Sequence, residues 1–210
     1  MSDRWGTGRI EAFSDGVFAI AITLLILEVS VPEAAFDNLW RGIVDEWPSY
    51  MAYATSFITI GWIWMAHHGI FRRLQFANSW VMRINLALLM IVAFLPFPTK
   101  LLAEAIHDRD AERAAVIFYG ATLLVISLLF SALWGVVMRD RELLRPEVSE
   151  REMNAILLAT TPTLGFYVSV IVLAIFAPRV AALGFLVIAI IDVLRAHGDQ
   201  TTPPAVAGPT

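Results

Sequence analysis

The first hydrophobic stretch of the chain, residues 9–29, carries side chains that could do chemistry at both of its ends. Arg9, Glu11 and Asp15 lie near its start, and Glu28 lies near its end. Ionisable groups at membrane depth are costly, and they usually face a bundle interior or a water-filled path. The chemistry expected of them is therefore charge pairing inside a helix bundle or contact with ions that pass along it.

One face of the same stretch alternates bulky apolar side chains with small or hydroxylated ones. Steps of three and four residues bring its members to one side of an α-helix. A helix that faces only lipid has no use for this alternation, whereas a helix that lines a narrow pore has one. Ordinary bundle packing is the alternative, with the Thr23 hydroxyl bonded back to its own helix. This patterned face consists of Phe13, Ile20 and Leu27 and of the residues three positions after each of them, Gly16, Thr23 and Ser30.

The composition is that of a membrane protein. The chain has 210 residues, of which 58% are hydrophobic and 16% charged, and its mean hydropathy is +0.69. These values exclude an ordinary soluble domain and indicate several membrane-spanning helices. The sequence contains no cysteine, which excludes disulfides and thiol chemistry. Its first residues lack the basic region and cleavage site of a signal peptide, so the first hydrophobic stretch is expected to be a retained span.

Six hydrophobic segments follow one another, so the predicted fold is all-α: a polytopic membrane protein with six transmembrane helices per subunit. The uncharged part of the first segment, residues 16–27, measures about 18 Å as a helix. That is short of the roughly 30 Å hydrocarbon core, so its charged ends must lie at the interface or inside protein. A transmembrane domain over residues 1–197 is followed by a Pro-rich, disordered tail, 198–210. The predicted spans are residues 10–31, 48–67, 80–102, 114–138, 153–178 and 180–195.

The distribution of Lys and Arg predicts the orientation of these spans. Six crossings put both termini on one side of the membrane, and that side holds ten of the 15 Lys and Arg residues. The positive-inside rule therefore predicts cytoplasmic termini, in a multi-pass protein of a bacterial inner (plasma) membrane. Six short spans can hardly enclose a conduit alone. We therefore expect the patterned face to meet the same face of other subunits on a symmetry axis.

Signatures of enzymes are missing from the sequence. It has no Gly-rich phosphate loop, no nucleophile elbow and no HExxH motif. His67 and His68 are adjacent, so on a helix they point about 100° apart and do not easily chelate one metal together. We expect no catalytic residues, no metal site and no nucleic-acid partner.

Polar side chains in the first three spans indicate contacts between helices. Asn85 lies in an apolar run and is expected to hydrogen-bond to a neighbouring helix. Asp15 has two interpretations. With Ser14 it is an interfacial residue near a helix start, or it is a buried carboxylate that needs a partner. In the second case the partner is Arg9 or a histidine at the end of the second span, at the depth of Trp64.

The string RIEAFSDGVFAIAITLLILEV, residues 9–29, resembles the first helix of the transmembrane potassium-channel family of endosomes and lysosomes. The hallmark of that family is Arg, three residues, then Phe-Ser-Asp, which here is Arg9 followed by Phe13, Ser14 and Asp15. The family is also similar to two later strings, SFITIGWIWMAHHGIFRR at residues 56–73 and INLALLMIVAFLPFPT at residues 84–99. The resemblance covers residues 9–99 strongly and the later half mainly by hydropathy. Family-like positions in the two later strings are Trp64, His67, His68, Asn85, Pro96, Phe97 and Pro98.

The resemblance implies a homotetramer in which the first helix of each subunit lines the pore. The family lacks the carbonyl filter of ordinary potassium channels. Its constriction is a ring of large aliphatic side chains, which maps onto Ile20. A polar layer maps onto Thr23 and a second apolar layer onto Leu27, and we expect these layers below and above Ile20. The spacing of the face adds Phe13, Gly16 and Ser30 as secondary positions. The resemblance also implies a hydrogen-bond network that ties the first helix to its neighbours, with the candidates Arg9, Phe13, Ser14, Asp15, Trp64, His67, His68 and Asn85.

The expected function is a leak-type, potassium-preferring cation channel with a hydrophobic constriction that gates by dewetting. Its expected partners are the lipid bilayer, monovalent cations and three further copies of the chain, and it needs no cofactor besides the permeant K⁺. One alternative is a proton channel that uses Asp15 and a histidine of the second span as a relay. Another is a non-conducting membrane scaffold or lipid-binding protein.

Overall fold

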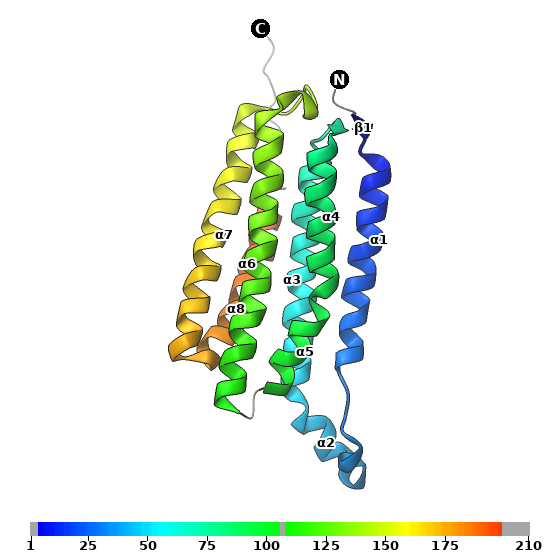
Figure 1. Ribbon diagram of the computed structural model, residues 1–210. Helices are drawn as coiled ribbons and strands as arrows, with labels where there is room; N and C mark the ends of the chain where they lie inside the picture. Colours follow the sequence, from blue (N-terminus) through cyan, green and yellow to red (C-terminus); the bar gives the residue numbers. More distant parts are fainter. Residues whose placement is uncertain (1–3, 106–107, 199–210) are drawn as a thin grey trace.

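The computed structural model describes residues 4–105 and 108–198, which form a bundle of long helices (Figure 1). The tail expected to be disordered lies outside the described residues, apart from its first residue. The shorter elements are β1 (Trp5–Gly6), η1 (Leu25–Glu28), η2 (Glu33–Asn38), α2 (Leu39–Asp45), β2 (Phe76–Ala77) and η4 (Arg141–Leu143). The longer helices are α1 (Gly8–Leu24), α3 (Trp47–Phe71), α4 (Ser79–Phe94), α5 (Pro96–Glu104), α6 (Arg109–Arg139), α7 (Glu150–Phe176) and α8 (Pro178–Gly198).

Each of the six predicted ranges falls mainly on helix. The third is divided at Leu95, because Pro96 has no backbone N–H to donate and starts a new helix, α5. By length and hydropathy, three stretches of the described chain are candidate membrane spans. They are Gly8–Glu28, Ser79–Glu104 and Arg109–Arg139.

Side-chain caps fix where several helices begin. The Asn78 side chain accepts hydrogen bonds from two backbone N–H groups at the start of α4, and Asp108 does the same at the start of α6. The N–H groups of Ala111 and Asp110 hold the pKa of the Asp108 carboxyl below its ordinary value. Ser149 forms a reciprocal capping box at the start of α7.

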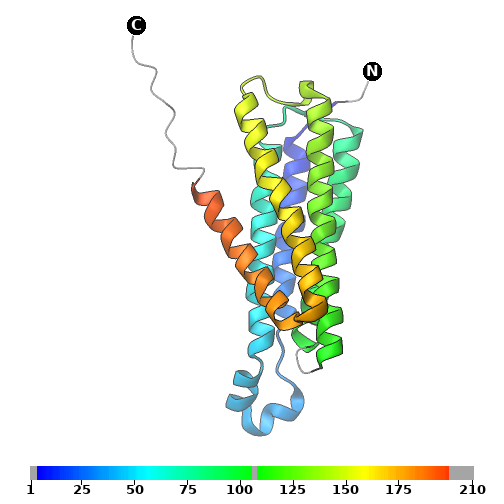
Figure 2. The same cartoon turned by 90° about the vertical axis from the view of Figure 1, so that its left-hand side faces the viewer.

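α6 lies at the centre of the bundle and α1 at its edge. α6 contacts α4, α5, α7 and α8, whereas α1 packs mainly on α3 and α4. Figure 1 shows α1 along one side of the molecule, and Figure 2 shows α8 leaning away from the other helices. Only 22% of the most apolar window of the α1 segment is buried, against 50% of that of α6. Most of α1 is therefore free to contact something outside its own subunit.

A small β-structure closes the end of the bundle where α1 begins, and the all-α prediction missed it. β1 pairs antiparallel with β2, and a single bridge joins Leu74 to Leu144. Arg4 forms ion pairs with Glu142 and, at 3.9 Å, with Asp140. The hydrogen bond to Glu142 raises the pKa of Arg4. These contacts tie the start of α1 to the loops α3–α4 and α6–α7.

Candidate functional site

α1 buries one narrow stripe against α3 and α4. At 100° per residue, this stripe and the patterned face lie on roughly opposite sides of the helix, about 150° apart. The patterned face therefore points away from the subunit's own bundle. The buried stripe consists of Ser14, Phe18, Ala21 and Leu25.

The large side chains of the patterned face are well exposed in the single subunit. The exposed fractions are 57% for Phe13, 61% for Ile20 and 71% for Leu27. The Thr23 hydroxyl oxygen lies 2.9 Å from the carbonyl oxygens three and four residues before it, so it donates its proton back to the helix. Its lone pairs are then free to accept a hydrogen bond or to contact a cation.

The face ends sooner than its spacing predicts. α1 tightens into the 3₁₀-helix η1 at Leu25, and the helix stops at Glu28. Ser30 therefore lies beyond the helix, exposed but off the face, and its assignment to the face is wrong. Pro32 contributes to this ending because it disfavours helical backbone at the residue before it. A 3₁₀ turn advances about 120° per residue, which rotates Leu27 by roughly 60° relative to an uninterrupted α-helix.

The three candidate layers follow one another in one direction along the helix. Thr23 lies between Ile20 and Leu27, so the expectation of one layer below and one above Ile20 is wrong. The rise of an α-helix separates Ile20 from Thr23 by about 4.5 Å along the axis. The larger rise of η1 places Leu27 about 7.5 Å beyond Thr23.

A buried chain of hydrogen bonds links α1, α4 and α3. Ser14 Oγ donates to the carbonyl oxygen of Ile10 at 2.8 Å and accepts from Asn85 Nδ2 at 3.1 Å. Asn85 Oδ1 lies 2.8 Å from His67 Nε2. An amide oxygen only accepts, so this nitrogen of His67 carries the proton. The His67 ring also stacks on Phe71, with centroids 4.3 Å apart, so its orientation is fixed from two sides.

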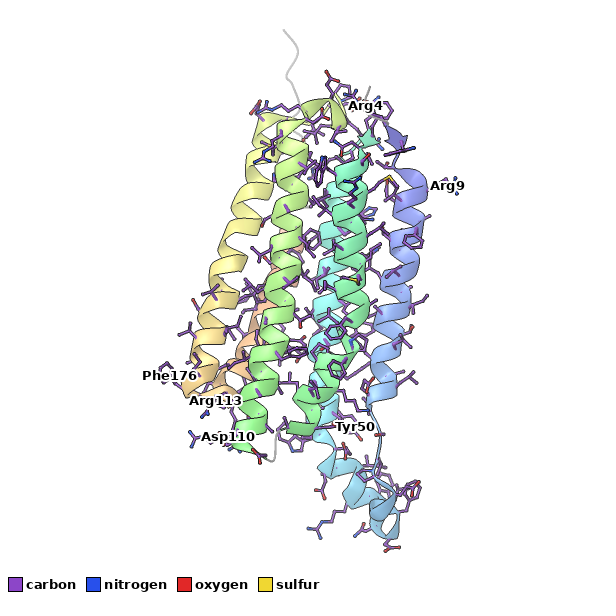
Figure 3. All side chains as sticks on the ribbon, in the orientation of Figure 1. Arg4, Arg9, Tyr50, Asp110, Arg113 and Phe176 are labelled. Carbon is purple, nitrogen blue, oxygen red and sulfur yellow. The ribbon has the colours of Figure 1, made fainter. Side chains whose placement is uncertain are left out.

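A second contact joins α1 to α3 nearer the surface. Trp64 Nε1 donates to Asp15 Oδ1 at 2.8 Å, and the Trp64 ring stacks on His68. Asp15 is exposed in the single subunit, so its interpretation as a carboxylate buried within the subunit is wrong, and its partner is neither Arg9 nor a histidine. Arg9 points away from the bundle (Figure 3) and has no hydrogen bond or ion pair within the described part of the subunit.

Sequence reasoning missed a buried hydroxyl cluster between α3, α5 and α6. Ser56 Oγ lies 2.7 Å from Thr99 Oγ1 and 3.0 Å from the Tyr119 hydroxyl. Thr99 also donates to the carbonyl oxygen of Leu95. The signal for this cluster was the presence of hydroxyl residues in three apolar runs, which does not reveal that Ser56, Thr99 and Tyr119 meet. The cluster anchors α5 immediately after the helix break.

An ion pair at the end of η1 was also missed. Lys100 Nζ lies 3.5 Å from the carboxylate of Glu28. Lys100 is the only lysine in the sequence, and its position shortly after the Pro-Phe-Pro sequence was the only available signal. The described residues contain no group of three or more His, Cys, Asp or Glu side chains that could hold a metal ion. The site therefore consists of an outward-facing helix, two hydrogen-bonded anchors behind it and an ion pair at one end.

Comparisons with known proteins point to one family. The family model described as the endosomal/lysosomal potassium channel TMEM175 matches residues 9–96. A Streptomyces collinus protein named as a potassium channel is 44% identical over 143 residues, which cover 68% of this chain and 69% of that protein. A Danio rerio protein named as the endosomal/lysosomal proton channel TMEM175 is 36% identical over 150 residues, which cover 67% of this chain and 29% of that protein.

The fold has a solved counterpart in the same family. A crystal structure described as a lysosomal potassium-selective channel TMEM175 homolog from Chamaesiphon minutus aligns with a TM-score of 0.82 at 38% identity. The alignment covers 90% of this chain and 97% of that one. These similar proteins are ion channels and not enzymes. The sequence identity and the shared fold together show that this chain belongs to the TMEM175 family.

Proposed function

We propose that four copies of this chain form a leak-type, potassium-preferring cation channel whose pore is lined by α1. The observation that carries the proposal is the direction of the patterned face. It carries Gly16 and Thr23 between bulky side chains, yet it points away from the subunit's own bundle. Lipid has no use for a hydroxyl and a glycine at these positions, whereas a pore shared by several subunits does.

In the proposed assembly, each subunit crosses a bacterial plasma membrane six times with both termini in the cytoplasm. The three candidate spans and the remaining apolar helices α3, α7 and α8 support this arrangement. A single α1 cannot surround a pore, and closed rotational symmetry is the common way to bring identical faces together on an axis.

Three layers would act on a passing ion. A ring of Ile20 side chains forms the hydrophobic constriction, which excludes water when it is narrow. The Thr23 hydroxyls follow about 4.5 Å beyond it with their lone pairs free, and Leu27 forms the second apolar layer. Without a dense ring of oxygens, the preference for K⁺ comes from its lower cost of dehydration, so discrimination against Na⁺ is modest.

The two anchors behind α1 would hold the pore helix at a fixed distance from the axis. Asn85 and His67 hold its buried side through Ser14, and Trp64 binds Asp15 between the buried side and the pore face. Their role in this proposal is positional, since none of them lies on the face that carries Ile20.

Proton conduction is the second candidate, and a relative's name favours it. The Danio rerio relative is named as a proton channel, and His67 lies in a hydrogen-bond chain that reaches α1. Asp15, however, binds Trp64 and makes no hydrogen bond to His67, so the relay lacks a direct link within the subunit. A non-conducting scaffold or lipid-binding protein is the third candidate.

The proposal is tested by flux through purified protein in liposomes, measured for K⁺, Na⁺ and protons. Ile20→Asn should wet the constriction, raise K⁺ flux and weaken discrimination against Na⁺, whereas Ile20→Phe should nearly abolish flux. A proton-driven signal independent of K⁺ would favour the proton channel. Absence of any flux from well-assembled protein would favour the scaffold.

A further inference from the structure

An ion pair lies at the far end of the proposed pore helix, one residue beyond Leu27. Lys100 Nζ lies 3.5 Å from Glu28 Oε2, and the side chains are 48% and 23% exposed. Both groups therefore still reach solvent, so the pair is screened by salt and contributes little to the stability of the fold. What it does control is the net charge at this end of α1.

The backbone that carries Lys100 is held firmly. Thr99, the preceding residue, is 1% exposed and hydrogen-bonds to Ser56, which in turn contacts the Tyr119 hydroxyl. α5 also contacts η1 directly. The ammonium group is thus tethered by a flexible side chain to a fixed point beside Glu28.

The pair lies in the wall of an open cavity of about 540 Å³ between η1 and α5. Water and ions can therefore reach both charges. The cavity is next to the Leu27 layer, at the end of the bundle opposite to β1. Its wall includes Leu24, Leu27, Glu28, Phe97, Lys100 and Glu104.

We propose that Lys100 masks the Glu28 carboxylate at the mouth of the pore and thereby sets how strongly the mouth concentrates cations. This inference rests on the proposed tetrameric channel. In that assembly each pair is neutral, so four pairs add no net charge to the mouth. Removal of Lys100 leaves four unpaired carboxylates at this end of the pore, on the side of each pore helix that faces α5. Removal of Glu28 leaves four unpaired ammonium groups there.

Charges at a pore mouth change the local concentration of cations, and salt suppresses the effect. The Debye length is about 30 Å at 0.01 M and about 3 Å at 1 M ionic strength. At low salt, four like charges at the mouth should therefore change K⁺ conductance roughly threefold or more, and at 1 M salt they should have almost no influence.

The test is single-channel recording in planar bilayers at 10 mM and at 1 M KCl. Lys100→Gln should raise conductance about threefold at 10 mM, Glu28→Gln should lower it by a similar factor, and the double variant should match the wild type. All four proteins should agree at 1 M. Arg113→Gln is the matched control, because it removes one positive charge from an ion pair with Asp110 at the same end of the molecule. Figure 3 shows that pair on α6, on the other side of the bundle from α1.

Each single variant decides the question by itself, so a folding failure of one does not remove the test. Equal conductance of a well-assembled single variant and the wild type at 10 mM would overturn the inference. A change that persists at 1 M, or that has the same sign in both single variants, would do the same, because it would indicate a structural effect. A wild type that carries no K⁺ current would refute the proposed channel and this inference with it.

Discussion

Asn85→Leu should separate α1 from the helices that position it. The Asn85 side chain is 2% exposed and makes hydrogen bonds on both sides, to Ser14 Oγ at 3.1 Å and to His67 Nε2 at 2.8 Å. Leucine has the same branched shape and the same number of side-chain heavy atoms, so the substitution removes the polar partner without leaving a cavity. It leaves the N–H of His67 buried without an acceptor, whereas Ser14 keeps the bond that it donates to Ile10.

The expected cost follows from the unpaired imidazole N–H. A buried donor that loses its partner costs about 1–3 kcal/mol. Measured hydrogen bonds between membrane helices average only about 0.6 kcal/mol, because the unfolded state in a membrane also finds partners. We therefore expect Asn85→Leu to lower the free energy of unfolding by about 1–2 kcal/mol, a factor of roughly 5–30 in the folded-to-unfolded ratio.

The assay is reversible unfolding in mixed micelles, read as a double-mutant cycle with His67→Phe. Phenylalanine keeps the ring contact with Phe71 but has no N–H to leave unpaired. Asn85→Leu should therefore cost less in the His67→Phe background than in the wild type. Leu86→Ala is the control, since Leu86 is next in sequence but 54% exposed. Equal costs in the two backgrounds would refute the role of this hydrogen bond.

Three further outcomes are expected. Gly120→Ala should lower the thermal unfolding midpoint, because a Cβ there would meet side chains of α7 and α8 at 2.8 Å, and overpacking typically costs about 1–3 kcal/mol. Gly61→Ala is the control and should not lower the midpoint, because a Cβ at Gly61 would meet nothing within 4 Å. Wild type should unfold at a higher temperature than Asp108→Ala at neutral pH. That difference in unfolding temperature should fade as the pH falls below about 4. The pKa of Asp108 is lowered in the folded protein, so its carboxylate stabilises the fold at higher pH and stops doing so when it is protonated. A pH-independent difference would contradict the role of its charge. Trp64→Phe should loosen α1 as much as Asp15→Ala does and change gating or assembly more than ion selectivity, which is checked by native mass measurement together with reversal potentials.

The elements that follow from local pattern were predictable from the sequence. Long uncharged runs gave the approximate helix ranges. Pro96 could have marked the break between α4 and α5, although one span over residues 80–102 was predicted. The alternation around Ile20 and Thr23 identified the side of α1 that its own bundle leaves exposed. These features depend on residues close to one another in the chain, so periodicity and proline chemistry are enough to find them.

The features that depend on contacts between distant residues were not predictable. The resemblance placed Asp15 and Trp64 in one candidate network, but nothing near Asp15 indicates that Trp64, 49 positions later, is its direct partner. The pairing of β1 with β2 involves two residues on each side, too few for a strand pattern. The change to a 3₁₀-helix at Leu25 has no glycine or proline inside it to announce it. Each of these is decided by tertiary packing, which a single sequence does not display.

The central claim, that the outward face of α1 lines the ion path, is tested most directly by cysteine accessibility, because the chain contains no cysteine of its own. Single variants Ile20→Cys, Thr23→Cys and Leu27→Cys would be treated with a charged, water-soluble thiol reagent during recording of K⁺ current. Val17→Cys and Ile22→Cys are controls at similar depth, because both side chains are half-buried and pack against the subunit's own core. The account predicts block of the current at the three face positions and none at the two controls. Block at the controls with no effect at Ile20 would contradict it.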